Sequence, residues 1–406
     1  MFYWGEGNKI FPLTPHHLNI GAFYEEVGSW LGMGNIGAPG KMMGLAAYGK
    51  PRFFDRAWVG NAYDWMKQNF DRAQWSEHCI TMARRIGYDL GPLANRDQMT
   101  APINVDIAAS TQKLFEETII IAAEALHKVI SRAGRKTPNL CLSGGTALNC
   151  PANSRILREG RFLNLFVEPG CNDTGLADGA AMFLYYNVLD RPLGRIETAS
   201  PYLGLEISGQ MITAALEAAK GQIEFRPCLD GADAAAQDLV DDRIVAWYEG
   251  RSEIGPRALG HRSILADPRK RENWARVNRL KGREYWRPFA PSVLESEAHN
   301  WFHGGPHPSP YMLFTSAVRS NDLPAITHLD GTARIQTVNP SNGEFFRVIE
   351  RFFAKTGVPV VLNTSFNGPH EPIVETPAEA IQFLVSSDLD ALFIGGFRVV
   401  RKDVAR

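Results

Sequence analysis

The chain has few cysteines and no long apolar run, and both shortages limit what it can be. Its five cysteines are scattered from Cys79 to Cys228 and include no CxxC pair. We interpret them as reduced thiols of a cytoplasmic protein. No apolar run reaches the roughly 18 residues that a membrane span needs, and the start MFYWGEGNKI lacks the basic and apolar regions of a signal peptide. We therefore expect no membrane partner.

The chain also lacks a charge of one dominant sign. Its formal net charge is -1, which argues against a broad nucleic-acid surface, so we expect no nucleic-acid partner. With 406 residues, of which 45% are hydrophobic and 21% charged, the composition is that of an ordinary globular protein. This length predicts two domains of roughly 150 to 200 residues each.

Helical and strand patterns alternate in the first half. Apolar residues at helical spacing predict a long amphipathic helix over 107–130, with Gly134 as its stop. Two strand–glycine turn–helix units follow, and we expect the first helix to begin near Ala147. This repetition predicts an α/β fold with a mixed or parallel sheet. The turn-rich stretch 189–204 is the candidate linker, and a helix near 210–219 and a strand at RIVAWYEG are expected beyond it.

Both glycine turns have a chemical and a structural interpretation. Backbone amides of SGGTALN, before a helix, can approach a phosphate closely, because glycine has no Cβ and a helix N-terminus favours an anion. Glycine turns also simply connect strands to helices. The second turn, CNDTGLADG, adds Asp173 after a strand, where sites of open α/β sheets gather. An aspartate there is either a metal ligand or a helix cap.

Positive charge is concentrated between Arg251 and Arg287, with 11 Lys or Arg against 4 Asp or Glu. This region opens with RSEIGPRALGHRS, in which Gly255 and Pro256 interrupt the backbone between permanently charged arginines. A solvated basic helix near KRENWARVNRLKGRE is one interpretation. Glycine and proline among the arginines favour the other, an anion site.

Seven segments together carry a family resemblance. They are GKMMGLAAYG, LSGGTALNC, EPGCNDTGLADGAA, SEIGPRALGHRSILADPR, REYWRPFAPSVL, HLDGTARIQTV and LNTSFNGPHEPIVETP. In this order they resemble the carbamoyltransferase family of nodulation-factor, cephalosporin and aminoglycoside tailoring enzymes. The resemblance implies an α/β fold with a partial actin-like (ASKHA, Kae1-like) domain over 1–195, followed by an α+β YrdC-like domain over 200–406.

The resemblance implies a two-step reaction. The second domain would form carbamoyl adenylate from carbamoyl phosphate and ATP, and the first would transfer the carbamoyl group to a hydroxyl. Joining polyanions requires cations that neutralise and align phosphates, and the planar fork of arginine suits this. The implied carbamoyl phosphate and ATP contacts are Arg257, Lys281, Arg287, Met312, Thr332, Arg334 and Ser365. Among them, Lys281, Arg287 and Arg334 are the expected catalytic residues.

Two of these contacts have structural alternatives. Arg287 could instead form a structural ion pair. Ser365, like Asn363 in the same segment, could instead cap a turn.

In the first domain the resemblance implies a nucleotide site and a divalent metal, Fe²⁺ or Mg²⁺. The nucleotide contacts would be Lys41, Gly44, Gly144, Gly145 and Asn149. Asp173 would be the metal carboxylate. A hydroxyl that attacks carbamoyl adenylate must lose its proton to a base, which the sequence does not identify.

The chain departs from the family pattern in one respect. The family has an HxxxH helix that supplies two metal ligands, and a pair at this spacing here is His303 and His307, in FHGGPHPSP. Glycine and proline exclude a helix there, so we interpret both as surface loop histidines. His16 and His17 are adjacent and would point apart. We therefore expect a missing first lobe, either truncated or supplied by a second chain.

Other functions stay open. The chain could be a truncated, non-catalytic binding module. It could also be a tRNA threonylcarbamoyl-type modification enzyme, which shares both domain types but needs a basic RNA surface. The expected partner is a small hydroxylated acceptor, whose identity would depend on variable segments such as 54–79.

Overall fold

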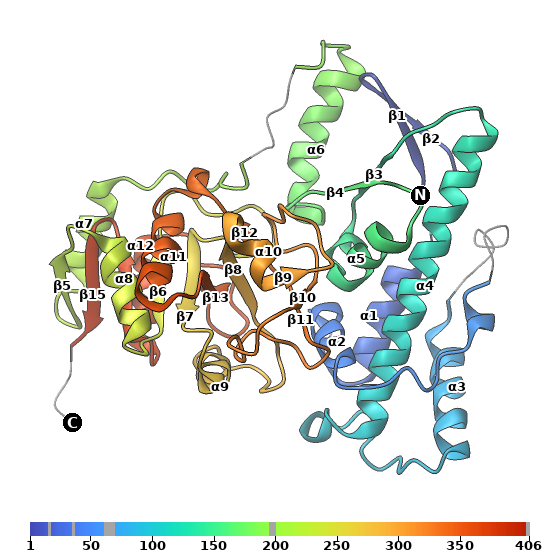
Figure 1. Ribbon diagram of the computed structural model, residues 1–406, viewed down its shortest axis with the longest axis horizontal. Helices are drawn as coiled ribbons and strands as arrows, with labels where there is room; N and C mark the ends of the chain where they lie inside the picture. Colours follow the sequence, from blue (N-terminus) through green and yellow to red (C-terminus); the bar gives the residue numbers. More distant parts are fainter. Residues whose placement is uncertain (15–17, 35–36, 61–69, 195–199, 403–406) are drawn as a thin grey trace. The chain divides into compact units, whose positions relative to one another are not determined.

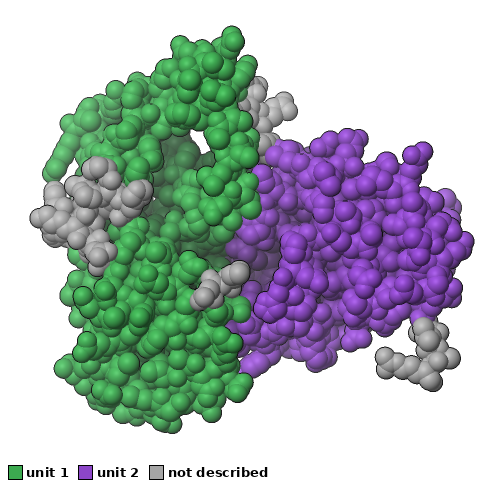
Figure 2. Space-filling view, turned by 180° about the vertical axis from the view of Figure 1, so that it is seen from behind, with its two compact units in different colours: residues 1–199 green, residues 200–406 purple. Residues whose placement is uncertain are grey.

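The computed structural model describes residues 1–406 except 15–17, 35–36, 61–69, 195–199 and 403–406. His16, His17 and part of the 54–79 segment therefore lie outside the described residues. The chain divides into two compact units, unit 1 (Met1–Ala199) and unit 2 (Ser200–Arg406), coloured separately in Figure 2. Both helices and strands are present, as the α/β prediction requires, and unit 2 contains a large mixed sheet.

Unit 1 is mostly helical. Its helices and helical turns are α1 (Ile20–Trp30), α2 (Ala38–Ala46), η1 (Arg56–Trp58), α3 (Arg72–Arg85), η3 (Arg96–Gln98), α4 (Pro102–Arg132), η4 (Gly145–Leu148), α5 (Cys150–Glu159), η5 (Asp173–Gly175), α6 (Leu176–Met182) and the π-helix η6 (Phe183–Val188). Its strands are β1 (Tyr3–Glu6), β2 (Lys9–Pro12), β3 (Asn139–Leu142) and β4 (Asn164–Val167). The first two form an antiparallel hairpin, and β3 pairs with β4 in parallel. Figure 1 shows the long α4 beside the shorter helices.

The long helix α4 confirms the prediction from apolar spacing. Ile107, Leu114, Phe115 and Ile130 are all buried along it. The helix starts earlier than predicted, because Pro102 occupies its first turn, where a missing N–H costs nothing. It ends at Arg132, just before Gly134, whose φ is +69°.

The first glycine turn is close to its prediction but not identical to it. A short 3₁₀ turn, η4, covers Ala147, and the α-helix α5 begins only at Cys150. The delay has a local cause: the side chain of Asn149 accepts the N–H of Ala152 at 3.2 Å and so caps α5. The parallel pairing of β3 with β4 confirms the predicted parallel arrangement.

Unit 2 is a mixed α/β structure. Its helices and helical turns are α7 (Gly209–Ala218), α8 (Gly231–Val240), α9 (Arg271–Leu280), η7 (Glu295–Glu297), α10 (Ala298–Trp301), η8 (Pro340–Asn342), α11 (Gly343–Thr356) and α12 (Pro377–Ser386). Its strands are β5 (Ile223–Pro227), β6 (Val245–Tyr248), β7 (Arg262–Ala266), β8 (Ala290–Leu294), β9 (Phe302–His303), β10 (Ser316–Val318), β11 (Thr332–Ala333), β12 (Gln336–Val338), β13 (Val360–Ser365), β14 (Ala391–Ile394) and β15 (Phe397–Arg401). Helix α7 and strand β6 lie where the sequence predicted them.

Eight of these strands form one sheet, in the order β12-β8-β13-β7-β6-β14-β15-β5. The pairs β12–β8 and β6–β14 are parallel, and the other pairs are antiparallel. Every residue of β6, β7, β8 and β14 is buried. Both faces of the central sheet are therefore covered, which explains why these strands have apolar runs instead of strict alternation.

One end of this sheet brings distant segments together. Strand β13 runs antiparallel to β7 and β8, and Ser365 pairs with Ser263 while Asn363 pairs with Ala290. Strand β12, parallel to β8, begins at the same end. The end of β13 and the starts of β7, β8 and β12 therefore meet at one edge of the sheet. The segments that carry the expected adenylation residues lead into or out of this edge.

Two further expectations concern cysteines and membranes. All five cysteines are free, as predicted for reduced thiols. Among the described residues, none of the helices combines the length and apolar character that crossing a bilayer would require.

Candidate active site

A buried carboxylate shapes the loop between β6 and β7. Glu253 is 9% exposed, and its Oε1 accepts the backbone N–H groups of Leu259 at 2.7 Å, His261 at 2.8 Å and Arg262 at 3.3 Å. Burial raises the pKa of Glu253 above its ordinary value, although these donors oppose the shift. The single acid of RSEIGPRALGHRS thus stabilises the loop conformation by accepting three of its backbone N–H groups.

A row of polar side chains on the adjacent strands β12, β8 and β13 holds this loop through its backbone carbonyls. Asn363 on β13 donates to the carbonyl of Ala258 at 3.3 Å and to Ser292 Oγ on β8 at 2.9 Å. Gln336 on β12 donates to the carbonyl of Leu259 at 2.7 Å and accepts from Ser292 Oγ at 2.6 Å. The alternative that Asn363 caps a turn is wrong, because it lies buried inside a strand.

The two permanently charged arginines of the loop have different environments. Arg262 is fully buried and donates to the carbonyls of Glu249 at 2.7 Å and Gly250 at 3.0 Å. Its guanidinium lies 3.6 Å from the centroid of the Tyr248 ring, so it has a structural role. Arg257 is half-buried, and its Nε is buried without a hydrogen-bond partner. The Nε of Arg262 is likewise buried without a hydrogen-bond partner, but backbone carbonyls already hold the terminal nitrogens of Arg262.

Five cations influence one another at this edge of the sheet. We call Arg257, Lys281, Arg283, Arg287 and Arg334 the basic cluster. Burial lowers the pKa of Lys281 well below its ordinary value, and the charges of Arg283 and Arg287 add to the effect. Burial also lowers the pKa of Arg283 to about 9, helped by Arg287 and Arg334. The pKa of Arg287 is lowered by burial and by Arg257, against the opposing charge of Glu284.

Lys281 joins the basic cluster to the end of β13. Its Nζ donates to the carbonyl of Ser365 at 2.5 Å and to Oδ1 and the carbonyl of Asn367 at 2.8 and 3.0 Å, and Ser365 Oγ lies at 3.3 Å. An ammonium has three donors, so these four acceptors compete for them. An anionic oxygen can replace one neutral acceptor without leaving the others unsatisfied.

Arg283 is a residue that the sequence reasoning did not select. Its Nε donates to Asn278 Oδ1 at 3.0 Å, its guanidinium lies 4.5 Å from the centroid of the Phe289 ring, and its Nη2 is buried without a hydrogen-bond partner. The available signal was a second cation two residues after Lys281, but the segment is a turn in which Gly282 has a φ of +53°, so spacing alone does not show that the two side chains approach each other. Arg287 does form the alternative ion pair, with Glu284 at 3.4 Å, but also belongs to the basic cluster.

The remaining expected contacts of unit 2 are engaged locally. Thr332 Oγ1 donates to Asp330 Oδ1 at 2.7 Å. Ser365 Oγ donates to Asn367 Oδ1 at 2.6 Å. Met312 is 2% exposed, packs with Leu259 and Ala290, and has a φ of +55°. These residues shape the edge of the sheet, and their ligand contacts stay predictions.

The expected nucleotide residues of unit 1 differ in what they expose. Gly144 has a φ of +91° and, like Gly145, has open space where a Cβ would point. The side chain of Asn149 is buried and exchanges hydrogen bonds with Gln112 at 2.9 and 3.1 Å. Lys41 Nζ donates to the carbonyl of Met33 at 3.1 Å, and Gly44 is buried in α2. Only the backbone at Gly144 and Gly145 therefore faces open space.

The expected metal ligand Asp173 is exposed at the start of η5. The cap residue of α6 is Gly175, so Asp173 does not occupy that helix-cap position. No group of three His, Cys, Asp or Glu side chains able to hold a metal occurs in the part of the chain that the structure describes. A single carboxylate holds a divalent ion weakly, so the described residues do not fit a complete Fe²⁺ or Mg²⁺ site.

His303 and His307, which have HxxxH spacing, do not form a helical pair. His303 is exposed on the short strand β9, as the surface prediction requires. His307 lies in the following loop, but both of its ring nitrogens are buried, so the surface prediction is wrong for that ring. Its ring centroid lies 4.2 Å from that of His299.

The lowered pKa values lead to a first prediction, proton uptake on anion binding. An anion among Lys281 and Arg283 raises both pKa values, so we expect net proton uptake when tripolyphosphate binds at pH 9. Calorimetry in two buffers with different ionisation enthalpies measures the number of protons taken up. We expect Lys281→Met to take up fewer protons than the wild type. Zero or negative uptake in the wild type would contradict a buried cationic site.

The same groups have a defined effect on stability without a ligand. Both bind protons less tightly in the folded chain than in the unfolded chain. Their contribution to the free energy of unfolding therefore rises with pH between about 9 and about 10.4, the ordinary pKa of lysine.

Comparisons with known proteins identify the family. Residues 1–182 match the family model described as carbamoyltransferase N-terminus, and residues 236–401 match carbamoyltransferase C-terminus. The chain belongs to the carbamoyltransferase family, as its motifs predicted.

Named relatives make the relationship more specific. The nodulation protein NolO of Bradyrhizobium diazoefficiens is 37% identical over 408 residues, which cover 98% of this chain and 72% of NolO. The nodulation protein NolNO of Sinorhizobium fredii is also 37% identical, over 98% of this chain and 58% of its own length. The 3'-hydroxymethylcephem-O-carbamoyltransferase of Amycolatopsis lactamdurans is 31% identical, over 88% of this chain and 64% of its own length.

Proposed function

We propose that the chain is an ATP-dependent O-carbamoyltransferase. Unit 2 forms carbamoyl adenylate from carbamoyl phosphate and ATP, and the carbamoyl group then passes to a hydroxyl of a small acceptor in unit 1. Pyrophosphate and inorganic phosphate both leave in the first step, so its balance consumes one water molecule. The cephem relative's name supports a hydroxyl acceptor. In this proposal unit 1 corresponds to a Kae1-like domain and unit 2 to a YrdC-like domain.

The basic cluster is the observation that carries this proposal. Five cations meet at one edge of a sheet, and burial lowers the pKa of three of them. Cations held close together in a poorly solvated site repel one another, and an anionic ligand offsets this unfavourable electrostatic free energy. Carbamoyl phosphate and ATP together present several phosphate charges that must be neutralised and aligned.

Each expected residue has a place in this proposal. Lys281, Arg287 and Arg334 stabilise the charge that develops on the reacting phosphate, and Arg257, Met312, Thr332 and Ser365 line the carbamoyl phosphate and ATP site. In unit 1 the backbone at Gly144 and Gly145 lines the nucleotide site, and the amide of Gly145 is the donor toward the nucleotide, because the amide of Gly144 donates to the carbonyl of Cys171 at 2.6 Å. Lys41, Gly44 and Asn149 support this nucleotide site through the packing described above.

Two other functions predict different results. A non-catalytic binding module would bind ATP and carbamoyl phosphate without releasing pyrophosphate. A tRNA threonylcarbamoyl-type enzyme would need a basic RNA surface, which the net charge of -1 disfavours. Transfer of radiolabel from carbamoyl phosphate to hydroxylated small molecules, with tRNA as a competing acceptor, separates all three.

Asp173 provides a second prediction, a loss of transfer without a loss of activation. In a chain assembled with all its family segments, we expect Asp173→Asn to abolish acceptor carbamoylation and retention of Fe²⁺ or Mg²⁺. Carbamoyl adenylate should still form, because Asp173 belongs to unit 1 and the basic cluster to unit 2. Loss of both steps together would indicate a folding role for Asp173 instead.

We also propose that unit 1 works with a further polypeptide segment that supplies the remaining metal ligands. Large apolar side chains of α6 and η6 are exposed, including Leu176 at 67%, Phe183 at 52% and Leu184 at 53%. The relatives NolO and NolNO contain length that this chain does not match. A segment of that kind could cover the exposed helix.

This proposal gives a third prediction. Replacing Phe183 and Leu184 by serine should weaken association with the unmatched segment of NolO at least tenfold in analytical ultracentrifugation. The exposed Leu229 of unit 2, replaced by serine, is the matched control and should change nothing. Equal association of both variants would contradict a docking role for α6 and η6.

A further inference from the structure

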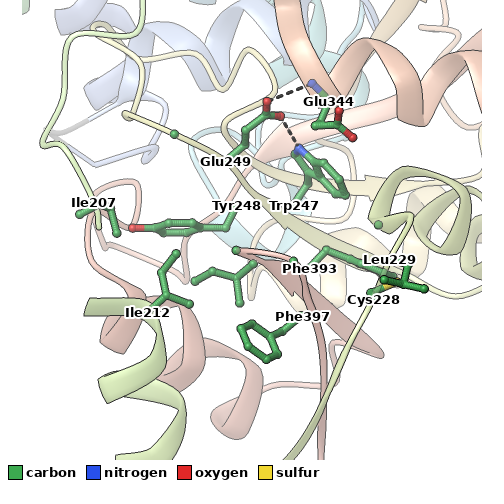
Figure 3. A pocket seen from close by; sticks show the side chains of 15 residues that line it. Ile207, Ile212, Cys228, Leu229, Trp247, Tyr248, Glu249, Glu344, Phe393 and Phe397 are labelled. Atoms are coloured by element: carbon green, nitrogen blue, oxygen red, sulfur yellow. Dashed lines mark hydrogen bonds between the residues drawn. The ribbon is translucent and has the colours of Figure 1, made fainter. Parts of the chain in front are cut away.

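Unit 2 has a cavity of about 350 Å³ that none of the five residues of the basic cluster lines. It lies where the parallel strands β6 and β14 end, and its walls include Trp247, Tyr248, Phe393 and Phe397 (Figure 3). Its size is within the range of small-molecule sites, roughly 300 to 1,000 Å³. The site proposed for adenylation does not explain this cavity.

Aromatic side chains form much of its wall. The rings of Trp247 and Phe393 have centroids 6.0 Å apart and are tilted by 32°. Phe397 is half-buried at the start of β15. The Tyr248 ring already holds the Arg262 guanidinium, at 3.6 Å from its centroid. Trp247 and Phe393 lie on one face of the sheet and Tyr248 and Phe397 on the other, and the pocket at the ends of β6 and β14 is lined by both pairs of rings. Aromatic faces attract cations, including organic ammonium groups, through their quadrupole.

The charge of the pocket has one sign. Its lining residues include Glu249 and Glu344 but no lysine, arginine or histidine. Glu344 pairs with Arg347 at 3.0 Å. Glu249 has no ion-pair partner within 4.0 Å among the described residues, and instead accepts the N–H groups of Trp247 Nε1 at 2.9 Å, Glu344 at 3.0 Å and Phe345 at 3.0 Å (dashed in Figure 3 where drawn).

These hydrogen bonds fix the position of the carboxylate. The Glu344 and Phe345 amides belong to the first turn of α11, and the Trp247 indole belongs to β6, so Glu249 is held from two elements. A fixed carboxylate next to aromatic faces attracts a positive ligand without reorganising. An anionic ligand would meet only like charge in the pocket lining.

We propose that this cavity binds a small organic cation, a substituted ammonium group whose apolar substituents contact the aromatic walls. The site is separate from the adenylation chemistry, so it does not depend on the proposed function. Its ligand is an additional substrate portion or an effector that carries an ammonium group.

Choline and its neutral isostere 3,3-dimethylbutan-1-ol test this assignment on the full chain, by ligand-observed NMR titration. They have the same shape and differ in charge. We expect choline to bind at least tenfold more tightly, and its affinity to fall as salt concentration rises. Equal affinities, tighter binding of the alcohol, or no detectable binding of choline would overturn the proposal.

Three variants locate the binding site. Glu249→Gln keeps the shape of the side chain, and we expect it to weaken choline binding at least fivefold without affecting the alcohol. Glu344→Gln, in which the lost carboxylate was already paired with Arg347, is the matched control and should change choline binding less than twofold.

Because Glu249 also contacts the start of α11, thermal melting checks the fold of its variant, and Phe397→Leu provides an independent test. The leucine keeps apolar volume but removes the aromatic face, so only choline should bind more weakly. Unchanged choline binding in Phe397→Leu, or an equal effect of Glu249→Gln and Glu344→Gln, would place the cation elsewhere and overturn the proposal.

Discussion

Replacing Arg257 by alanine is expected to lower carbamoyl-phosphate-dependent pyrophosphate release at least about a hundredfold, which corresponds to about 2.7 kcal/mol. The reason is geometric. Glu253 and the polar row of Ser292, Gln336 and Asn363 hold the loop in place, while the Nε of Arg257 remains without a partner. The fold therefore positions the backbone that carries this side chain before any ligand arrives. Lys281→Ala and Arg334→Ala should give losses of similar size.

The matched control for Arg257 is on the same loop. Arg251 is exposed and pairs with the exposed Glu206 at 3.0 Å, so Arg251→Ala removes one positive charge without touching the basic cluster. We expect less than a twofold change. Near-normal pyrophosphate release by a folded Arg257→Ala variant, or an equal loss in Arg251→Ala, would contradict the assignment.

Replacing Glu253 by leucine is expected to lower the free energy of unfolding of unit 2 by about 3 kcal/mol or more. The change leaves three backbone N–H groups, those of Leu259, His261 and Arg262, without their acceptor, and a lost partner costs about 1 to 3 kcal/mol for each buried donor. Chemical denaturation followed by tryptophan fluorescence measures the loss.

Its control is Glu206→Leu, because Glu206 is an exposed acid whose side chain is 83% accessible. We expect a change within about 0.5 kcal/mol there. Equal stability of Glu253→Leu and the wild type would mean that the loop does not depend on its buried carboxylate, and that Arg257 is not positioned in the way described here.

The sequence predicted the regular elements well, because their patterns are local. The apolar spacing of Ile107, Leu114 and Ile130 was sufficient to place α4, and the run RIVAWYEG placed β6. The start of α5 was missed by three residues, since the pattern of apolar residues does not reveal that Asn149 forms the cap. The pairing order of the eight-stranded sheet depends on contacts between distant segments, which periodicity does not encode.

The basic cluster was predicted in part. Local charge density and the family motifs indicated Arg257, Lys281, Arg287 and Arg334. Arg283 and the polar row were missed. For Ser292, Gln336 and Asn363 the reason is physical: they come from three segments distant in the sequence, and their roles appear only when β8, β12 and β13 are adjacent.

The metal prediction has a different status. The expected ligand Asp173 is exposed, and the described residues contain no group of three His, Cys, Asp or Glu side chains that could hold an ion. Whether a further segment completes the site stays a prediction.

Exchange of radiolabelled pyrophosphate into ATP tests the central claim most directly, because it reports reversible formation of carbamoyl adenylate and needs no acceptor. The purified 406-residue chain should catalyse exchange only when carbamoyl phosphate is present, and Arg257→Ala should lose it while Arg251→Ala retains it. Exchange that is independent of carbamoyl phosphate, or no exchange by a folded chain that binds ATP, would contradict an adenylate-forming site in unit 2.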